Sequence, residues 1–105
     1  MWSLFADAIK SHARSTFPNE CCGVIVENDR AREIIQMKNI SLAPETTFLL
    51  DFYEILGRDV SYIYHSHPSS SSVASPADIE YCNDIRIPFL IYSLKDDDFS
   101  LLMPR

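Results

Sequence analysis

The feature that most constrains the fold is a strand that runs into two histidines and is soon followed by a helix start. Residues 60–65 alternate in character and are rich in β-branched and aromatic side chains, which predicts a strand. It leads directly into His65-Ser66-His67-Pro68. Ser75-Pro76-Ala77-Asp78 then carries a helix-start signature, with a serine N-cap, proline at the first position and an acidic third residue. The sequence therefore predicts a strand, a short loop and a helix reaching about Ile85.

The rest of the chain continues this mixture of helices and strands. Apolar residues at three- and four-residue steps predict an amphipathic helix over residues 2–17, which ends before Pro18. Short β-rich runs predict a hairpin of strands 21–26 and 32–37, and further strands at 46–50, 89–92 and 99–103. A short helix is predicted at 51–56, with Asp51 as its N-cap. We expect a mixed α/β fold with a single mixed β-sheet flanked by helices, in one domain over residues 1–105.

Charge and composition exclude several classes of function. The net charge is −6 and the nine Lys and Arg residues are scattered, which argues against a nucleic-acid partner. With only two glycines, the chain has no glycine-rich phosphate loop. No stretch approaches the roughly 20 apolar residues that span a bilayer, and no signal-peptide pattern opens the chain, so we expect no membrane association.

The cysteines indicate a reducing compartment. Cys21, Cys22 and Cys82 are odd in number and two are adjacent, which is a poor disulfide framework. We expect a cytoplasmic protein in which these thiols are small buried apolar groups. A thiol nucleophile at Cys21 or Cys22 is an alternative, and it would need a nearby base.

The histidine pair has the geometry of a metal site. Residues i and i+2 of a strand share a face, so His65 and His67 can aim both imidazoles at one point. Asp78, eleven residues after His67 and in the first turn of the predicted helix, can supply a third ligand. Two histidines and a carboxylate suit Zn²⁺ and leave its fourth position open, as in catalytic zinc sites.

A zinc hydrolase also needs a general base and a donor for the developing oxyanion. Glu20 stands between the first helix and the first buried strand, where the sheet would hold it, although 15 acidic residues compete for this role. Ser75 could donate its hydroxyl, but capping the helix competes with that use.

Together these residues resemble the JAMM (MPN+, JAB1/Mov34) metalloprotease motif: Glu20, His65-Ser66-His67-Pro68, six residues, Ser75, two residues, Asp78. The resemblance spans nearly the whole chain. It is strongest to the phage branch, the N-terminal peptidase domain of tail assembly proteins similar to lambda tail protein K. Three features indicate that branch: Pro18-x-Glu20-x-Cys22-Gly23-Val24, the loop Asn39-Ile40-Ser41, and the short helix after Phe48.

The resemblance implies a zinc peptidase with the JAB1/MPN fold, of the cytidine-deaminase-like type, that cuts peptide or isopeptide bonds. His65, His67 and Asp78 would bind zinc, Glu20 would be the acid/base, and Ser75 would stabilise the oxyanion. The substrate would be a protein or peptide, such as a phage tail component, a peptidoglycan peptide or a ubiquitin-like conjugate. The protein would act in phage tail assembly, in the cytoplasm of a bacterial host or associated with the virion.

Two other functions remain open from the residues. One is a non-catalytic tail-assembly scaffold or binding module that retains a JAMM-like metal site. The other is a deaminase of the related fold, against which the missing His-x-Glu and Pro-Cys-x-x-Cys motifs count.

Several polar and aromatic residues are interpreted as structural. His12 is expected on the solvated helix surface. Residues 69–72, a serine run, are expected to form a flexible rim over the site, and residues 96–98 a solvated turn. Tyr62 and Tyr64 are expected to pack on the sheet face opposite His65.

Overall fold

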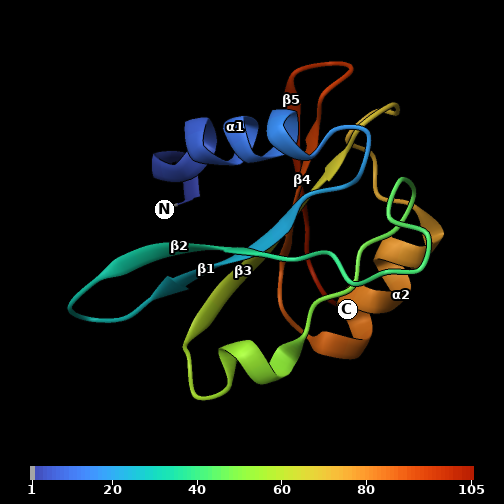
Figure 1. The fold of residues 1–105 in the computed structure, drawn as a ribbon. Helices are drawn as coiled ribbons and strands as arrows, with labels where there is room; N and C mark the ends of the chain where they lie inside the picture. The colour runs from blue at the N-terminus through green and yellow to red at the C-terminus, as the bar shows by residue number, and fades with distance from the viewer. Residues whose placement is uncertain (1) are drawn as a thin grey trace.

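The chain folds around one five-stranded sheet (Figure 1). The structure, a computed structural model, describes residues 2–105. Its elements in chain order are η1 (Trp2–Phe5), α1 (Ala6–Thr16), β1 (Cys22–Glu27), β2 (Arg32–Met37), η2 (Phe52–Ile55), β3 (Val60–His67), α2 (Pro76–Ile85), β4 (Phe89–Ser93) and β5 (Asp98–Leu102).

The sheet has mixed strand directions. Its order is β2-β1-β3-β4-β5. β3 and β4 are parallel, and the other neighbours are antiparallel. Parallel neighbours need a crossover connection, and α2 supplies it between β3 and β4. The predicted mixed α/β fold with a single mixed sheet is confirmed.

Strand alternation gives the sheet two buried faces, each covered by one α-helix (Figure 1). On one face α1 packs Ile9 and Ala13 against a cluster that includes Ile25, Tyr64 and Leu90. On the other face, Cys82 of α2 packs with the residues Cys22, Val24, Ile63, Phe89 and Ile91. His65 and His67 follow Ile63 by two and four residues on β3, so they belong to the α2 face.

The α1 face corrects the interpretation of His12. His12 is only 7% exposed, and its Nδ1 lies 2.7 Å from the Tyr64 hydroxyl. Tyr64 itself lies opposite Gly23, where an added Cβ would come within 2.4 Å of the Tyr64 ring. Gly23 therefore leaves the space that the tyrosine ring needs to reach His12. The predicted solvated position of His12 is wrong, whereas the predicted packing of Tyr64 is confirmed.

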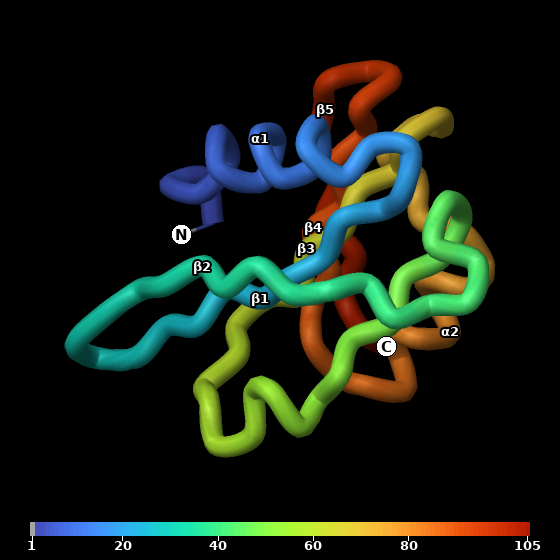
Figure 2. The backbone as a smooth tube through the Cα atoms, in the orientation of Figure 1, coloured from blue at the N-terminus to red at the C-terminus, as the bar shows by residue number. Residues whose placement is uncertain are grey.

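The connection between β2 and η2, residues 38–51, lies on the α2 side of the sheet (Figure 2). The strand predicted at 46–50 is wrong, because this segment is irregular. Phe48 and Leu50 are buried while the residues around them are more exposed, and this alternation imitates a strand. The backbone instead bonds to the side chain of Asn39, through the Leu49 N–H and the Thr47 carbonyl.

The predicted short helix after this loop is present as η2, and the Asp51 side chain caps it by accepting from the Tyr53 N–H. Within residues 2–105, no helix has the length and apolar character needed to cross a bilayer.

Candidate metal centre

The carboxyl end of β3 brings both histidine side chains into the interior. His65 is fully buried and His67 is 5% exposed. β3 extends to His67, two residues beyond the predicted strand, so both histidines have the extended backbone that puts them on one face. Phe48 stacks on the His65 ring, with centroids 4.2 Å apart and planes 20° apart.

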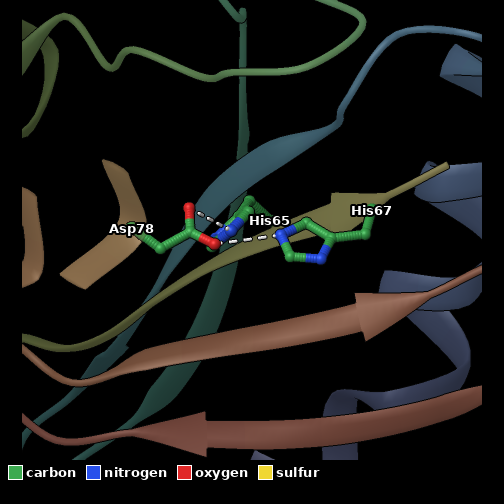
Figure 3. A group of neighbouring side chains, drawn as sticks. All are labelled: His65, His67 and Asp78. Carbon is green, nitrogen blue, oxygen red and sulfur yellow. Dashed lines mark hydrogen bonds and ion pairs between the residues drawn. The ribbon is translucent and has the colours of Figure 1, made fainter. Parts of the chain in front are cut away.

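Asp78 is delivered to the histidines by the first turn of α2. Ser75 caps this helix: its Oγ accepts from the Asp78 N–H at 3.1 Å, and its own N–H donates to Asp78 Oδ2 at 3.0 Å. This reciprocal capping box fixes the Asp78 carboxylate. Its Oδ1 lies 3.0 Å from His65 Nε2, and its Oδ2 lies 3.0 Å from His67 Nε2 (Figure 3).

These three side chains offer a donor set for one cation. One donor atom from each of His65, His67 and Asp78 lies within 4.8 Å of the other two. His67 Nδ1 donates to the Ser71 carbonyl at 2.7 Å, since a carbonyl can only accept, and this orients Nε2 toward Asp78. Both nitrogens of His65 are buried without a hydrogen bond.

His65 Nε2 faces the Asp78 carboxylate without a hydrogen bond to it, and a buried nitrogen in that state is costly. A cation shared with His67 and Asp78 would satisfy both the nitrogen and the carboxylate. Two imidazoles and a carboxylate are also ligands that zinc accepts. The residues therefore fit a bound metal ion.

The charges of this group follow from burial and mutual contact. Burial alone would raise the pKa of Asp78, but its contacts with His65 and His67 outweigh burial and lower it. Burial lowers the pKa of His65 despite the nearby carboxylate. Burial also opposes protonation of His67, but contacts with Asp78 and the Ser71 carbonyl raise its pKa. The carboxylate is thus held in its ionised, cation-binding form.

Glu20 lies beside this group, just before β1. Its side chain is 4% exposed, and its Oε1 is buried without a hydrogen-bond partner. The β1–β3 register pairs Cys22 with His65, and continuing it by two residues brings Glu20 opposite His67. Burial raises the pKa of the Glu20 carboxyl to about 8; the charge of His67 opposes this rise and that of Asp78 adds to it.

A cleft of about 220 Å³ is lined by three of the five predicted site residues. Glu20, His67 and Ser75 all line it, with Glu45, Thr46, Pro68, Ser69 and Ser70 around them. The other two predicted site residues, His65 and Asp78, contact His67 and each other, so all five lie in one place.

The serine run is only partly a rim. Ser69 and Ser70 are exposed at the cleft. Ser72, by contrast, is 5% exposed and its Oγ lies 2.6 Å from Ser100 Oγ.

The cysteines behave as structural groups. All three are free and buried, as expected. Burial raises the pKa of Cys21 to about 11 and that of Cys22 to about 12, so neither thiol ionises readily near neutral pH. This disfavours the thiol nucleophile.

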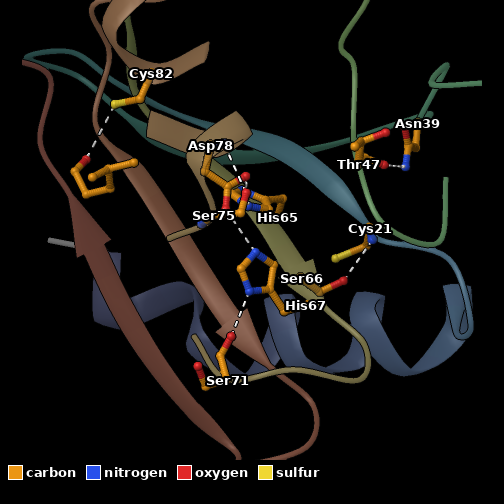
Figure 4. Close-up of polar contacts among 11 residues, drawn as sticks. Cys21, Asn39, Thr47, His65, Ser66, His67, Ser71, Ser75, Asp78 and Cys82 are labelled. Atoms are coloured by element: carbon orange, nitrogen blue, oxygen red, sulfur yellow. Dashed lines mark hydrogen bonds and ion pairs between the residues drawn. The ribbon is translucent and has the colours of Figure 1, made fainter. Parts of the chain in front are cut away.

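Three supporting residues were not singled out as part of the site in the sequence. Ser66 points to the α1 face, and its Oγ accepts from the Cys21 N–H at 2.8 Å (Figure 4). Phe48 stacks on His65 as described above. Asn39 bonds to the Glu20 carbonyl at 3.1 Å. Two sequence signals mark Asn39: its place in the Asn39-Ile40-Ser41 loop of the family resemblance, and its position two residues before Ser41, since asparagine side chains commonly bond to the backbone two residues on.

Comparison with known proteins identifies relatives of this chain. A family model described as prokaryotic homologs of the JAB domain matches residues 5–102. Tail tip assembly protein K of Escherichia phage N15 is 31% identical over 103 residues, covering 94% of this chain and 42% of the relative. A desampylase of Haloferax volcanii is 34% identical over 90 residues, covering 70% of this chain and 65% of the relative.

A probable TtuB-protein conjugate cleaving protease of Thermus thermophilus is 27% identical over 92 residues, covering 79% of this chain and 62% of the relative. The chain thus spans between 42% and 65% of the length of these curated relatives.

Solved structures agree on the fold. A JAB1/MPN domain protein from Archaeoglobus fulgidus superposes with a TM-score of 0.66 at 19% identity, over 94% of this chain and 83% of that protein. A protein from Desulfitobacterium hafniense superposes with a TM-score of 0.70 at 23% identity, over 94% of this chain and 86% of that protein. Because these structures are less than 25% identical in sequence, their likeness establishes the fold alone, which is the JAB1/MPN architecture.

Proposed function

Because this chain belongs to the family of prokaryotic homologs of the JAB domain, we propose that it is a zinc metallopeptidase that hydrolyses a peptide or isopeptide bond. The observation that carries the proposal is the unpartnered Glu20 carboxylate beside the His65, His67 and Asp78 group. A binding module has no use for a buried base next to a metal site, whereas a hydrolase requires one. Two relatives, a desampylase and a conjugate-cleaving protease, bear names that denote cleavage of protein conjugates.

In this proposal His65, His67 and Asp78 hold the zinc ion. Zinc would supply the Lewis acidity that makes a water molecule nucleophilic near neutral pH. The hydrogen bond from His67 Nδ1 to the Ser71 carbonyl orients that ring, and the capping box orients the Asp78 carboxylate.

Glu20 and Ser75 then act on the substrate. Glu20 accepts a proton from the attacking water, whose oxygen bonds to the carbonyl carbon, and it passes the proton to the amine that leaves as the C–N bond breaks. Burial of the Glu20 carboxyl favours its uptake of a proton from water, and a cation held beside it would favour the ionised form that begins the reaction. Ser75 Oγ accepts the Asp78 N–H through a lone pair, which leaves its hydroxyl hydrogen free for the developing oxyanion.

The setting of the reaction is part of the proposal. Residues 1–105 would form one JAMM/MPN+ peptidase domain acting on a protein or peptide. The relationship to tail tip assembly protein K supports a role in phage tail assembly, in the bacterial cytoplasm or on the virion. The substrate would then be a tail component or a peptidoglycan peptide.

Metal analysis and two variants test this function. The purified protein is expected to contain close to one zinc per chain by mass spectrometry, and His65→Ala to lose most of it. Glu20→Gln is expected to keep the zinc and lose hydrolysis of phage tail proteins or ubiquitin-like conjugates. Equal metal content in wild type and His65→Ala would refute the metal site.

The scaffold alternative predicts a different result. Suppose that wild type binds zinc and a tail protein, but forms no more cleavage product from that protein than Glu20→Gln does. The domain is then a binding module. Cleavage by wild type alone excludes that alternative.

A further inference from the structure

The side-chain amide of Asn39 connects the loop after β2 to the backbone of Glu20. Its Nδ2 donates to the Thr47 carbonyl at 3.0 Å (Figure 4). It also donates to the Glu20 carbonyl at 3.1 Å, with the Pro44 carbonyl at 3.4 Å. Its Oδ1 accepts from the Ser41 N–H at 3.0 Å and the Leu49 N–H at 3.1 Å. Since an amide has two N–H groups and two acceptor sites, these partners use its full capacity.

The same loop holds Glu20 from its other side. The Glu20 N–H donates to the Pro44 carbonyl at 2.7 Å. Both backbone groups of Glu20 are therefore bonded to the Asn39–Pro44 segment. Cys21, the next residue, is held through its N–H by Ser66 of β3. The backbone that carries the proposed base is therefore hydrogen-bonded on both sides of the Glu20 side chain.

Asn39 also fixes the residues that flank Phe48. It bonds to the Thr47 carbonyl on one side and to the Leu49 N–H on the other. Phe48 is 6% exposed and stacks on the His65 ring at 4.2 Å. One amide thus supports both halves of the site, the base at Glu20 and the ligand at His65.

We propose that Asn39 is a positioning residue for hydrolysis. By fixing the loop of residues 39–50, it holds the Glu20 carboxylate and the His65 ring at the right positions relative to each other. This inference rests on the proposed function. It gives Asn39 a role in the reaction beyond anchoring a loop. If Asn39 were lost, Glu20 could shift, and displacement of a catalytic group by about 1 Å can lower a rate about 100-fold.

A matched asparagine elsewhere in the chain provides the control. Asn28 lies in the β1–β2 turn, and its Oδ1 accepts from the Arg30 N–H at 2.8 Å and the Ala31 N–H at 3.0 Å. It therefore anchors a loop as the Oδ1 of Asn39 does, but it makes no contact with the site. Asn28→Ala reports the effect of losing such an anchor alone.

The test compares Asn39→Ala, Asn39→Asp and Asn28→Ala at saturating zinc. Asn39→Asp keeps the two acceptor contacts with Ser41 and Leu49 but loses the N–H groups that reach Glu20 and Thr47. We expect both Asn39 variants to lower kcat about 10- to 100-fold with little change in KM. We also expect amide hydrogen exchange at Glu20 to accelerate about 10-fold or more in both. Asn28→Ala should match wild type in kcat, KM and exchange at Glu20.

Two results would overturn the positioning role. One is a kcat in Asn39→Asp equal to that of wild type, because the loop anchor alone would then suffice. The other is unchanged exchange at Glu20 in Asn39→Ala. If wild type cleaves nothing, the proposed function fails, while exchange at Glu20 still decides whether Asn39 fixes that residue.

Discussion

At the scale of single residues, the Ser75 hydroxyl is used twice, as a helix cap and as a proposed oxyanion donor. Its Oγ accepts from the Asp78 N–H and caps α2, which the sequence predicted from the Ser-Pro-x-Asp pattern. The proposed mechanism also uses its hydrogen as an oxyanion donor. The two uses are compatible, because a hydroxyl accepts and donates at the same time.

Ser75→Gly separates these two uses. Glycine is nearly as good an N-cap as serine, so we expect the free energy of unfolding to fall by only about 0.3 kcal/mol. Loss of the donor should lower kcat about 100- to 1,000-fold with zinc content unchanged. Chemical denaturation and steady-state kinetics measure the two effects. A kcat equal to wild type would leave the cap as the only role of Ser75.

At the scale of elements, α1 is joined to the sheet by a buried hydrogen bond between His12 and Tyr64. The spacing of Ile9, His12 and Ala13 puts all three on one helical face, and the structure buries all three. Burial also lowers the pKa of His12, which keeps the ring neutral and suited to a hydrogen bond with a hydroxyl.

Tyr64→Phe would leave His12 Nδ1 buried without its partner. We expect the free energy of unfolding to fall by about 1–3 kcal/mol, which urea denaturation measures. Tyr62→Phe is the control, because Tyr62 lies partly buried on the same face of β3 and its hydroxyl bonds to none of the described residues. Equal losses in the two variants would contradict a specific contribution from the His12 contact.

At the scale of the whole molecule, the proposed metal site joins β3 to α2. Its ligand His67 on β3 lies eleven residues before its ligand Asp78 on α2. Metal bound there would stabilise the native state, because the unfolded chain does not hold the three ligands together.

Zinc removal should therefore lower thermal stability. At free zinc about 100 times its Kd, binding contributes about 2.7 kcal/mol. For a chain of this size that corresponds to a fall in Tm of about 10–20 °C on chelation. Calorimetry with and without chelator measures it, and His65→Ala should show almost no response. A wild-type Tm that chelation leaves unchanged would argue against the site.

The parts of the protein that depend on short-range pattern can be predicted from the sequence. The strand into His65 and His67, the Ser75 cap that presents Asp78, and the mixed sheet all follow from periodicity and capping within a few residues. Glu20 was selected among many acidic residues mainly by the resemblance to a family motif.

The support that distant segments give to the site depends on the three-dimensional fold. Asn39 bonds to Glu20, Phe48 stacks on His65, and His12 bonds to Tyr64 across 52 positions of the chain. The β-rich run at 46–50 predicts a strand, but its backbone bonds to the Asn39 side chain, to Ala43 and to Ile40 instead of to a neighbouring strand. Such contacts join residues far apart in the chain, and no local pattern encodes which long-range partner a buried polar group will find.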